Sequence, residues 1–167
     1  YGPSKNGKTS MAMILAKALA KHYRVVYDSV EEGIRKTVRM AVERHGMDEV
    51  GRNFFMLDRE LYDELFFRLK HMKRFGVVFI DSVQFMGLQI SQYRQLKMTF
   101  PDKLFVFISH VKNNRGTSPE GRTALRIMQD SDVIFSVQGF KAFVTSRFGG
   151  TGKFTISEKM AEEFYVK

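Results

Sequence analysis

The chain has 167 residues and carries 27 lysines and arginines against 18 aspartates and glutamates, a formal charge of +9 that favours a polyanionic partner. Its length suits one domain with a substantial core, and a hydrophobic content of 44% with 16 phenylalanines excludes a disordered chain. The absence of cysteine excludes disulfides and thiolate metal sites and is compatible with a cytoplasmic location, while no stretch is long and apolar enough to span a membrane.

The chain starts with a segment that fits the phosphate-binding pattern G-x-x-x-x-G-K-[ST] at every fixed position. We predict that ATP binds to this loop, which consists of Gly2, Pro3, Ser4, Lys5, Asn6, Gly7, Lys8, Thr9 and Ser10. Its glycines allow a close backbone approach, and successive N–H groups at a helix start form an anion site. Lys8 would reach the β- and γ-phosphates, and the Thr9 hydroxyl would ligate Mg²⁺. The alternative is a Gly-rich surface turn.

The segments on either side of the loop bear on this prediction, because the pattern requires a helix directly after it. Apolar residues recur there at helical spacing, namely Met11, Ile14, Leu15, Ala18 and Leu19. A buried strand is expected before such a loop, so we interpret the sequence as a piece of a larger protein whose first strand is missing.

The rest of the chain alternates between apolar runs and helical patterns. Strands are predicted at residues 24–28, 53–57, 77–81 and 103–110, with helices at 34–45, 58–72 and 88–98. Asp58 can cap the second of these helices, and Gly46 ends the first. A polar loop at 112–121 and a helix of about two turns precede three strands at 133–137, 142–146 and 153–156. The alternation indicates an α/β fold with a mostly parallel sheet and antiparallel C-terminal edge strands.

Polar residues stand at the predicted carboxyl ends of the strands, where open α/β sheets bind ligands. Asp81 is placed to hold Mg²⁺ opposite Thr9; the alternative is an aspartate that caps the next turn. Many AAA+-type ATPases carry a glutamate directly after this aspartate, but here the residue is Ser82. Glu31 and Glu32 are therefore the candidates for the base that activates water, or else they are solvated acids at a helix start.

His110 follows another predicted strand and could sense the γ-phosphate, although a single histidine at a strand end is more often structural. Basic residues cluster at residues 68–74, 112–126 and 141–153. Each cluster alone is typical of a solvated face, but together they make nucleic acid a plausible partner.

In this order, the motifs resemble those of RecA-like ATPases, especially the branch of RadA/Sms, DnaB-type helicases and KaiC. Residues 2–9 resemble the Walker A motif, and residues 78–84 resemble the Walker B segment of RadA-like proteins. The pair Glu31-Glu32 lies where this family carries its catalytic glutamate and is similar to the KaiC pair. Residues 109–111 resemble the polar motif that couples nucleotide state to a DNA-facing loop.

The C-terminal strands add a further resemblance. Residues 146–149 are similar to part of the Lys-Asn-Arg-Phe-Gly motif of RadA and to the DnaB strand pair whose basic residues reach the neighbouring subunit's γ-phosphate. Thr145 replaces the lysine that opens the RadA motif, so Arg147, with Lys141 or Lys153, would have to supply the trans-acting charge. The alternative for Arg147 is a hairpin arginine on a solvated edge.

The resemblance implies a single RecA-like domain, a three-layer sandwich that binds and hydrolyses Mg-ATP in a ring or filament. It implies single- or double-stranded DNA as partner, contacted after Gln84 and after His110 by Lys112, Arg115 and Arg122. The alternative is a KaiC-like regulatory ATPase that does not bind nucleic acid. The adjacent glutamates Glu31 and Glu32 favour this alternative, whereas the basic charge of the chain does not. A small-metabolite kinase is less favoured because no Arg-rich lid is evident.

Overall fold

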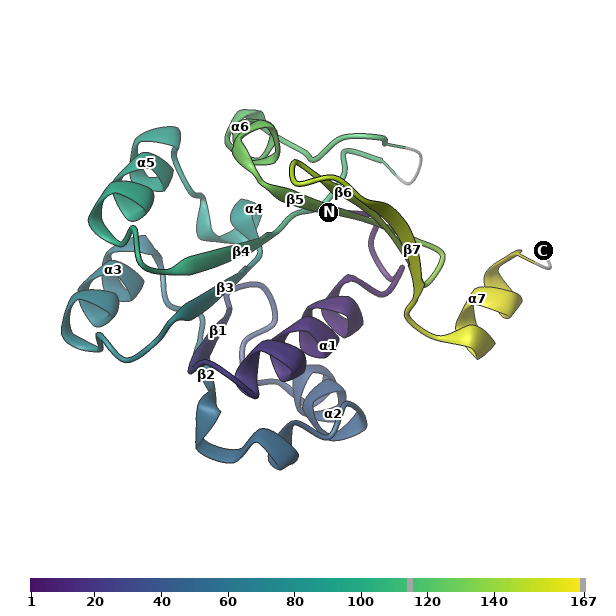
Figure 1. Ribbon diagram of the computed structural model, residues 1–167, viewed down its shortest axis with the longest axis horizontal. Coiled ribbons are helices and arrows are strands. Elements are labelled where there is room, and N and C mark those ends of the chain that lie inside the picture. The colour runs from purple at the N-terminus through teal and green to yellow at the C-terminus, as the bar shows by residue number, and fades with distance from the viewer. Residues whose placement is uncertain (114–115, 166–167) are drawn as a thin grey trace. The chain divides into compact units, whose positions relative to one another are not determined.

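The computed structural model describes residues 1–113 and 116–165, so Arg115, one of the predicted DNA contacts, lies outside the described residues. The chain divides into two compact units. We call Ala12–Ile108 the parallel unit, and Tyr1–Met11 together with the chain from Ser109 onward the antiparallel unit. Figure 1 shows the α/β architecture of the chain.

The parallel unit is built on a four-stranded parallel sheet of order β2-β1-β3-β4. Its strands are β1 (Val25–Ser29), β2 (Phe54–Asp58), β3 (Val77–Asp81) and β4 (Leu104–Ile108). Each prediction places these strands within one or two residues. The central strands β1 and β3 are buried at every position, whereas β2 and β4 are partly exposed because each has only one neighbour. Only the two central strands, β1 and β3, are therefore buried along their whole length.

Helices cover both faces of this sheet (Figure 1), with α3 and α5 on one face and α1 and α2 on the other. They are α1 (Lys8–Ala20), α2 (Lys36–Arg44), α3 (Tyr62–His71), α4 (Val83–Met86) and α5 (Ile90–Thr99), with a 3₁₀ segment at Met47–Asn53. Alternate residues of a strand point to opposite faces. Tyr27 and Phe79 accordingly pack on the side of α1, in one cluster with Met13 and Ala16.

The helix predicted directly after the phosphate loop is confirmed as α1. Its buried positions include Ala12, Met13, Ala16 and Ala20, whereas Ala18, one of the apolar residues that predicted it, is exposed. Because this helix is apolar nearly all round, its sequence pattern does not select one face.

Asp58 does not cap α3, which begins only at Tyr62. The Leu61 N–H at the start of that helix donates to Glu64 Oε2 at 2.9 Å, and Asp58 Oδ1 accepts from the Ile34 N–H at 3.1 Å. Gly46 does follow the end of α2, in a left-handed conformation with φ 59°.

The antiparallel unit contains a separate three-stranded sheet of order β5-β6-β7. Its strands are β5 (Val133–Gln138), β6 (Lys141–Ser146) and β7 (Thr151–Thr155), with helices α6 (Arg122–Asp130) and α7 (Glu158–Tyr165). These strands were expected at the edge of the parallel sheet. They pair instead with one another, because short hairpins let each strand bond to its neighbour in sequence. Within the described chain, no helix is long and apolar enough to cross a membrane.

Candidate active site

The phosphate loop lies in the antiparallel unit, and its geometry requires both fixed glycines. A Cβ added to Gly2 would lie 2.0 Å from the carbonyl oxygen of Val137 in β5, so no larger residue fits. Gly7 has φ +98°, a conformation that side chains disfavour, and its added Cβ would lie 3.0 Å from the Phe140 ring. The first glycine therefore permits a close approach to the sheet, and the second permits the turn.

Asn6 braces this loop against the turn between β5 and β6. Its Oδ1 accepts a buried hydrogen bond from the Gly139 N–H at 2.8 Å, and its backbone oxygen accepts from the Phe140 N–H at 3.1 Å. Its Nδ2 donates to the Ser4 carbonyl at 2.8 Å. The sequence pattern treats Asn6 as a variable position, and only the fold reveals that its side chain shapes the loop.

Lys8 and Thr9 occupy the first turn of α1, which contains no acidic residue. Lys8 Nζ donates to the Pro3 carbonyl at 2.8 Å, so the side chain folds back over its own loop. The helix start carries partial positive charge from its N–H groups, and no nearby carboxylate of the same turn offsets it. This combination suits a bound anion.

In the parallel unit, Asp81 ends β3 beside Ser29 at the end of β1. The buried Tyr27 hydroxyl donates to Asp81 Oδ2 at 2.6 Å, and its ring stacks on Phe79 with centroids 5.4 Å apart. Burial, and then the charge of Asp81, raises the pKa of Tyr27 well above its ordinary value. Tyr27 therefore remains a proton donor that orients the Asp81 carboxylate. The sequence analysis missed this role because it depends on the strand register.

The two candidate glutamates differ in their local bonding. The Glu31 N–H donates to the Asp81 carbonyl at 3.0 Å, which attaches this residue directly to the end of β3. The Glu32 carboxylate accepts a hydrogen bond from the Thr37 hydroxyl, and its carbonyl accepts from Arg59 Nη2 at 2.9 Å. The structure thus brings Glu31 and Asp81 together, whereas Glu32 is bonded to Thr37 in the first turn of α2 and to Arg59 directly after β2.

Asp28 is a buried carboxyl that the sequence analysis did not single out. It is fully buried on the opposite face of β1 from Tyr27, and its Oδ1 accepts from the Glu60 N–H at 3.2 Å. Burial raises the pKa of Asp28 to about 7, against the lowering effect of that hydrogen bond. Among the residues that the structure describes, its Oδ2 and the buried Ser82 Oγ find no hydrogen-bond partner. An apolar strand that ends in Asp-Ser gave no signal that this carboxyl is the buried one.

The remaining predicted residues belong to the antiparallel unit. His110 lies beside Gly2 in a short parallel bridge, and its carbonyl accepts from the Glu120 N–H at 2.8 Å. Lys112 and Arg122 are exposed, as contacts to a polyanion would need to be.

Arg147 follows β6 and is mostly exposed, with Nη1 3.3 Å from Asp132 Oδ1. The turn at Gly139–Phe140, which contacts the phosphate loop, lies at the other end of this six-residue strand. Strand geometry separates these ends by about 20 Å. Arg147 therefore lies at the opposite end of β6 from the turn that braces the phosphate loop.

The predicted residues are thus distributed over both units. The phosphate loop, His110 and Arg147 belong to the antiparallel unit, while Asp81, Glu31 and Glu32 belong to the parallel unit. No protein-family model matches the chain, and a search of curated proteins finds no match.

Proposed function

We propose that this chain is a Mg²⁺-dependent ATPase domain with the three-layer RecA-like fold. The observation that carries the proposal is the geometry of the phosphate loop. Gly2 cannot carry a side chain, Gly7 has a positive φ, and the loop leads into a helix start without acidic residues. These are the properties that an anion-binding loop of this pattern needs.

The residues present fit a magnesium nucleotide. In the antiparallel unit, the Thr9 hydroxyl is a ligand of the kind that Mg²⁺ takes beside bound phosphates, and in the parallel unit Asp81, oriented by the Tyr27 hydroxyl, is a carboxylate of the kind that holds Mg²⁺ through water. Bound Mg²⁺ would neutralise phosphate charge. Lys8 would exchange its hydrogen bond to the Pro3 carbonyl for one to the β- and γ-phosphates. No other side chain of the loop needs to supply charge, because the backbone N–H groups do so.

Glu31 is our candidate for the base that orients and deprotonates the attacking water. Its backbone bond to the Asp81 carbonyl keeps it at the strand end where the metal-holding carboxylate lies. Glu32 is the alternative candidate, and its carboxylate accepts a hydrogen bond from the Thr37 hydroxyl.

Arg147 would act on a nucleotide bound to a neighbouring copy of the chain. The length of β6, about 20 Å, separates Arg147 from the Gly139–Phe140 turn that braces the phosphate loop, which supports action in trans rather than in cis. An arginine that stabilises transition-state charge can raise turnover by about 10³- to 10⁵-fold. The proposal therefore includes a homo-oligomer, a ring or a filament, with ATP between subunits.

DNA is the proposed partner that such an ATPase would act on. The chain's charge of +9 and the exposed Lys112 and Arg122 support a partner rich in phosphate. A regulatory ATPase that acts through protein partners is the second candidate, which the adjacent glutamates Glu31 and Glu32 favour by their similarity to KaiC.

The test of the nucleotide site compares Lys8→Ala with Lys21→Ala, which removes the same charge directly beyond the other end of α1. We expect Lys8→Ala to abolish binding of a fluorescent ATP analogue in equilibrium titrations, and Lys21→Ala to bind as the wild type does. Equal affinities in the two variants would contradict the proposed site.

The partner is tested by the ATPase rate with and without single-stranded DNA at increasing salt. Stimulation that fades as salt rises, and that weakens in a Lys112→Ala/Arg122→Ala double variant, is the expected result. Turnover that no DNA alters would instead favour the regulatory ATPase.

A further inference from the structure

We propose that the outward face of the β5-β6-β7 sheet is a second docking surface, and that its ligand is single-stranded DNA. We call it the Phe143 face. Its central residues are Ser136, Lys141, Phe143, Thr145, Thr151 and Lys153, and Ile134, Gln138 and Thr155 flank them in the same register. The partner is the one in the proposed function, on which this inference rests, but the surface is different from the loops that carry Lys112 and Arg122.

The two faces of this sheet have different environments. Val137 and Ala142 are buried on the inner face, where they pack with Met11 at the start of α1. Along the central strand β6, Ala142 and Val144 are buried or half-buried, whereas Phe143 and Thr145 are exposed. The inner face is therefore occupied by the chain's own core, and the Phe143 face is open to solvent.

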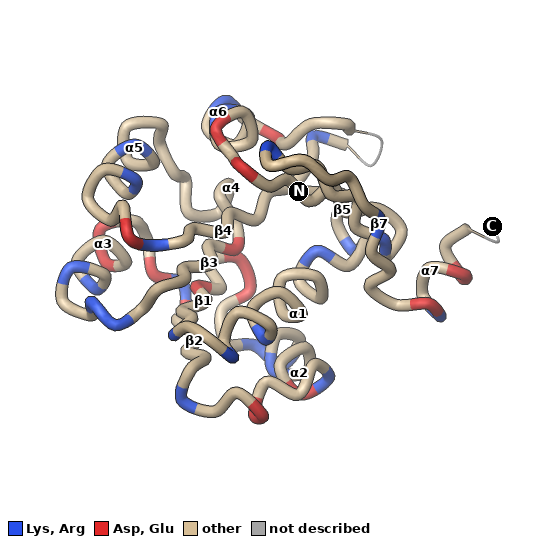
Figure 2. The backbone as a smooth tube through the Cα atoms, viewed as in Figure 1, with Lys and Arg blue, Asp and Glu red and all other residues tan. Residues whose placement is uncertain are grey.

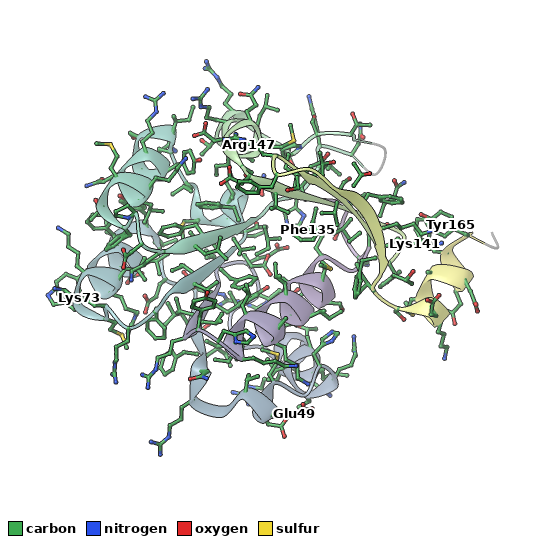
Figure 3. The ribbon with its side chains drawn as sticks, in the orientation of Figure 1. Glu49, Lys73, Phe135, Lys141, Arg147 and Tyr165 are labelled. Atoms are coloured by element: carbon green, nitrogen blue, oxygen red, sulfur yellow. The ribbon has the colours of Figure 1, made fainter. Side chains whose placement is uncertain are left out.

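An aromatic ring lies at the centre of this open face. Phe143 is 43% exposed although β6 has a neighbour on each side, Ser136 opposite it in β5 and Lys153 opposite it in β7. At one end of the face, Lys141 Nζ lies 4.3 Å from the ring centroid of Tyr165, which is itself 51% exposed (Figure 3). Rings alternating with lysines are typical of surfaces that stack bases and contact the backbone phosphates.

The charged side chains of this sheet and its turns are all positive. Residues 133–157 contain Lys141, Arg147 and Lys153 but neither aspartate nor glutamate, and Figure 2 shows no acidic segment along β6 and β7. Threonine and serine hydroxyls surround Phe143 and can donate to phosphate oxygens. The face therefore complements a polyanion.

This combination favours single-stranded DNA over the other occupants. A second copy docked face to face would oppose lysine to lysine, which costs free energy. Duplex DNA keeps its bases stacked inside, so an exposed ring would find no free base to contact, whereas an unpaired strand offers every base.

The decisive comparison is between Phe143→Ala and Phe154→Ala. Phe154 is also 43% exposed, but it lies in register with Ala142 and so belongs to the inner face. We expect Phe143→Ala to weaken binding of a fluorescent oligothymidylate about tenfold or more, since loss of one stacking ring has that effect, and Phe154→Ala to leave affinity within about twofold. Unchanged affinity in Phe143→Ala, or equal losses in both, would overturn the proposal.

Three further substitutions distinguish the contribution of ring stacking from those of apolar area and of charge. Phe143→Trp should retain affinity, while Phe143→Leu should lose it, and retention in Phe143→Leu would count against stacking. Lys153→Ala should lower the slope of log affinity against log salt by about 0.7, the value for one phosphate contact on a single strand. Because these side chains are exposed, the thermal midpoints of the variants should match the wild type.

Failure of this inference and failure of the proposed function give different results. Affinity for oligothymidylate is measured without nucleotide, so loss or retention of ATP binding in Lys8→Ala leaves the comparison of Phe143→Ala with the wild type unaffected. If Lys112→Ala/Arg122→Ala abolishes DNA binding and Phe143→Ala does not, the loops bind DNA and the Phe143 face does not. If Phe143→Ala dissociates an oligomer in sedimentation and leaves DNA affinity intact, the face is a contact between copies and the inference is wrong.

Discussion

The two units of this chain offer opposite kinds of polar chemistry. The antiparallel unit presents backbone N–H groups and cations, in the phosphate loop, at Lys8 and at Arg147. The parallel unit presents carboxylates at the ends of its strands, above all Asp81 and Asp28. One unit is thus suited to anions and the other to cations or protons.

This difference has a structural cause. An anion site made of backbone N–H groups depends on the path of the chain, so it depends on glycines such as Gly2 and Gly7. A carboxylate site depends on burial and on hydrogen-bond donors, because these set whether the acid is charged. The two units should therefore fail in different ways when they are altered, the first through steric overlap and the second through protonation.

The largest expected effect separates phosphate binding from hydrolysis. Glu31→Gln should lower kcat about 10²- to 10⁴-fold, the usual contribution of a general base, and should leave ATP affinity unchanged because the substitution alters no residue of the phosphate loop. Glu32→Gln should have a much smaller effect on steady-state turnover, since its carboxylate is bonded to Thr37. Normal turnover in both variants would remove the proposed mechanism, and equal losses would remove the distinction between them.

Asp28→Asn tests the expectation that the parallel unit responds to protonation of its buried carboxyl. The pKa of Asp28 is about 7 in the folded protein and 3.8 in a solvated aspartate, so the unfolded chain releases this proton first as pH rises. The contribution of Asp28 to the free energy of unfolding is therefore fully present below about pH 4 and is lost as pH rises from about 4 to about 7. In Asp28→Asn this loss is absent, so the variant should be more stable than the wild type at pH 8 by up to about 4 kcal/mol.

Urea unfolding at a series of pH values measures this difference, which should vanish near pH 4. A carboxyl titration by NMR should show a midpoint near 7 for Asp28. A variant that is less stable than the wild type at pH 8 would show that the ionised carboxylate is stabilising, contrary to the expectation.

The smallest expected effect tests the steric requirement for glycine in the phosphate loop of the antiparallel unit. Gly2→Ala places a Cβ 2.0 Å from the Val137 carbonyl oxygen, so the loop or β5 must shift, at a cost of about 1–3 kcal/mol in unfolding free energy and with weaker ATP binding. Gly152→Ala is the matched control, because nothing lies within 4 Å of its added Cβ. Denaturant unfolding and nucleotide titration measure both variants. Equal stability of Gly2→Ala and Gly152→Ala would indicate that the loop tolerates a side chain.

The sequence alone predicted the local elements and the motifs. The phosphate loop, the helix after it and the seven strands lie where their patterns place them, because apolar runs and turn residues act over short distances. It also predicted polar residues at strand ends, and Asp81 ends β3 as expected. The resemblance to RecA-like ATPases remains a prediction that the experiments above address.

Only the tertiary structure decided which of these residues meet. Strand register places Tyr27 against Asp81, the fold buries Asp28 completely, and hairpin pairing makes β5, β6 and β7 a separate sheet. The buried face of α1 was decided in the same way, since an almost wholly apolar helix can bury any side. These outcomes depend on contacts between segments far apart in the chain, and a local pattern does not encode the partner that each segment will have.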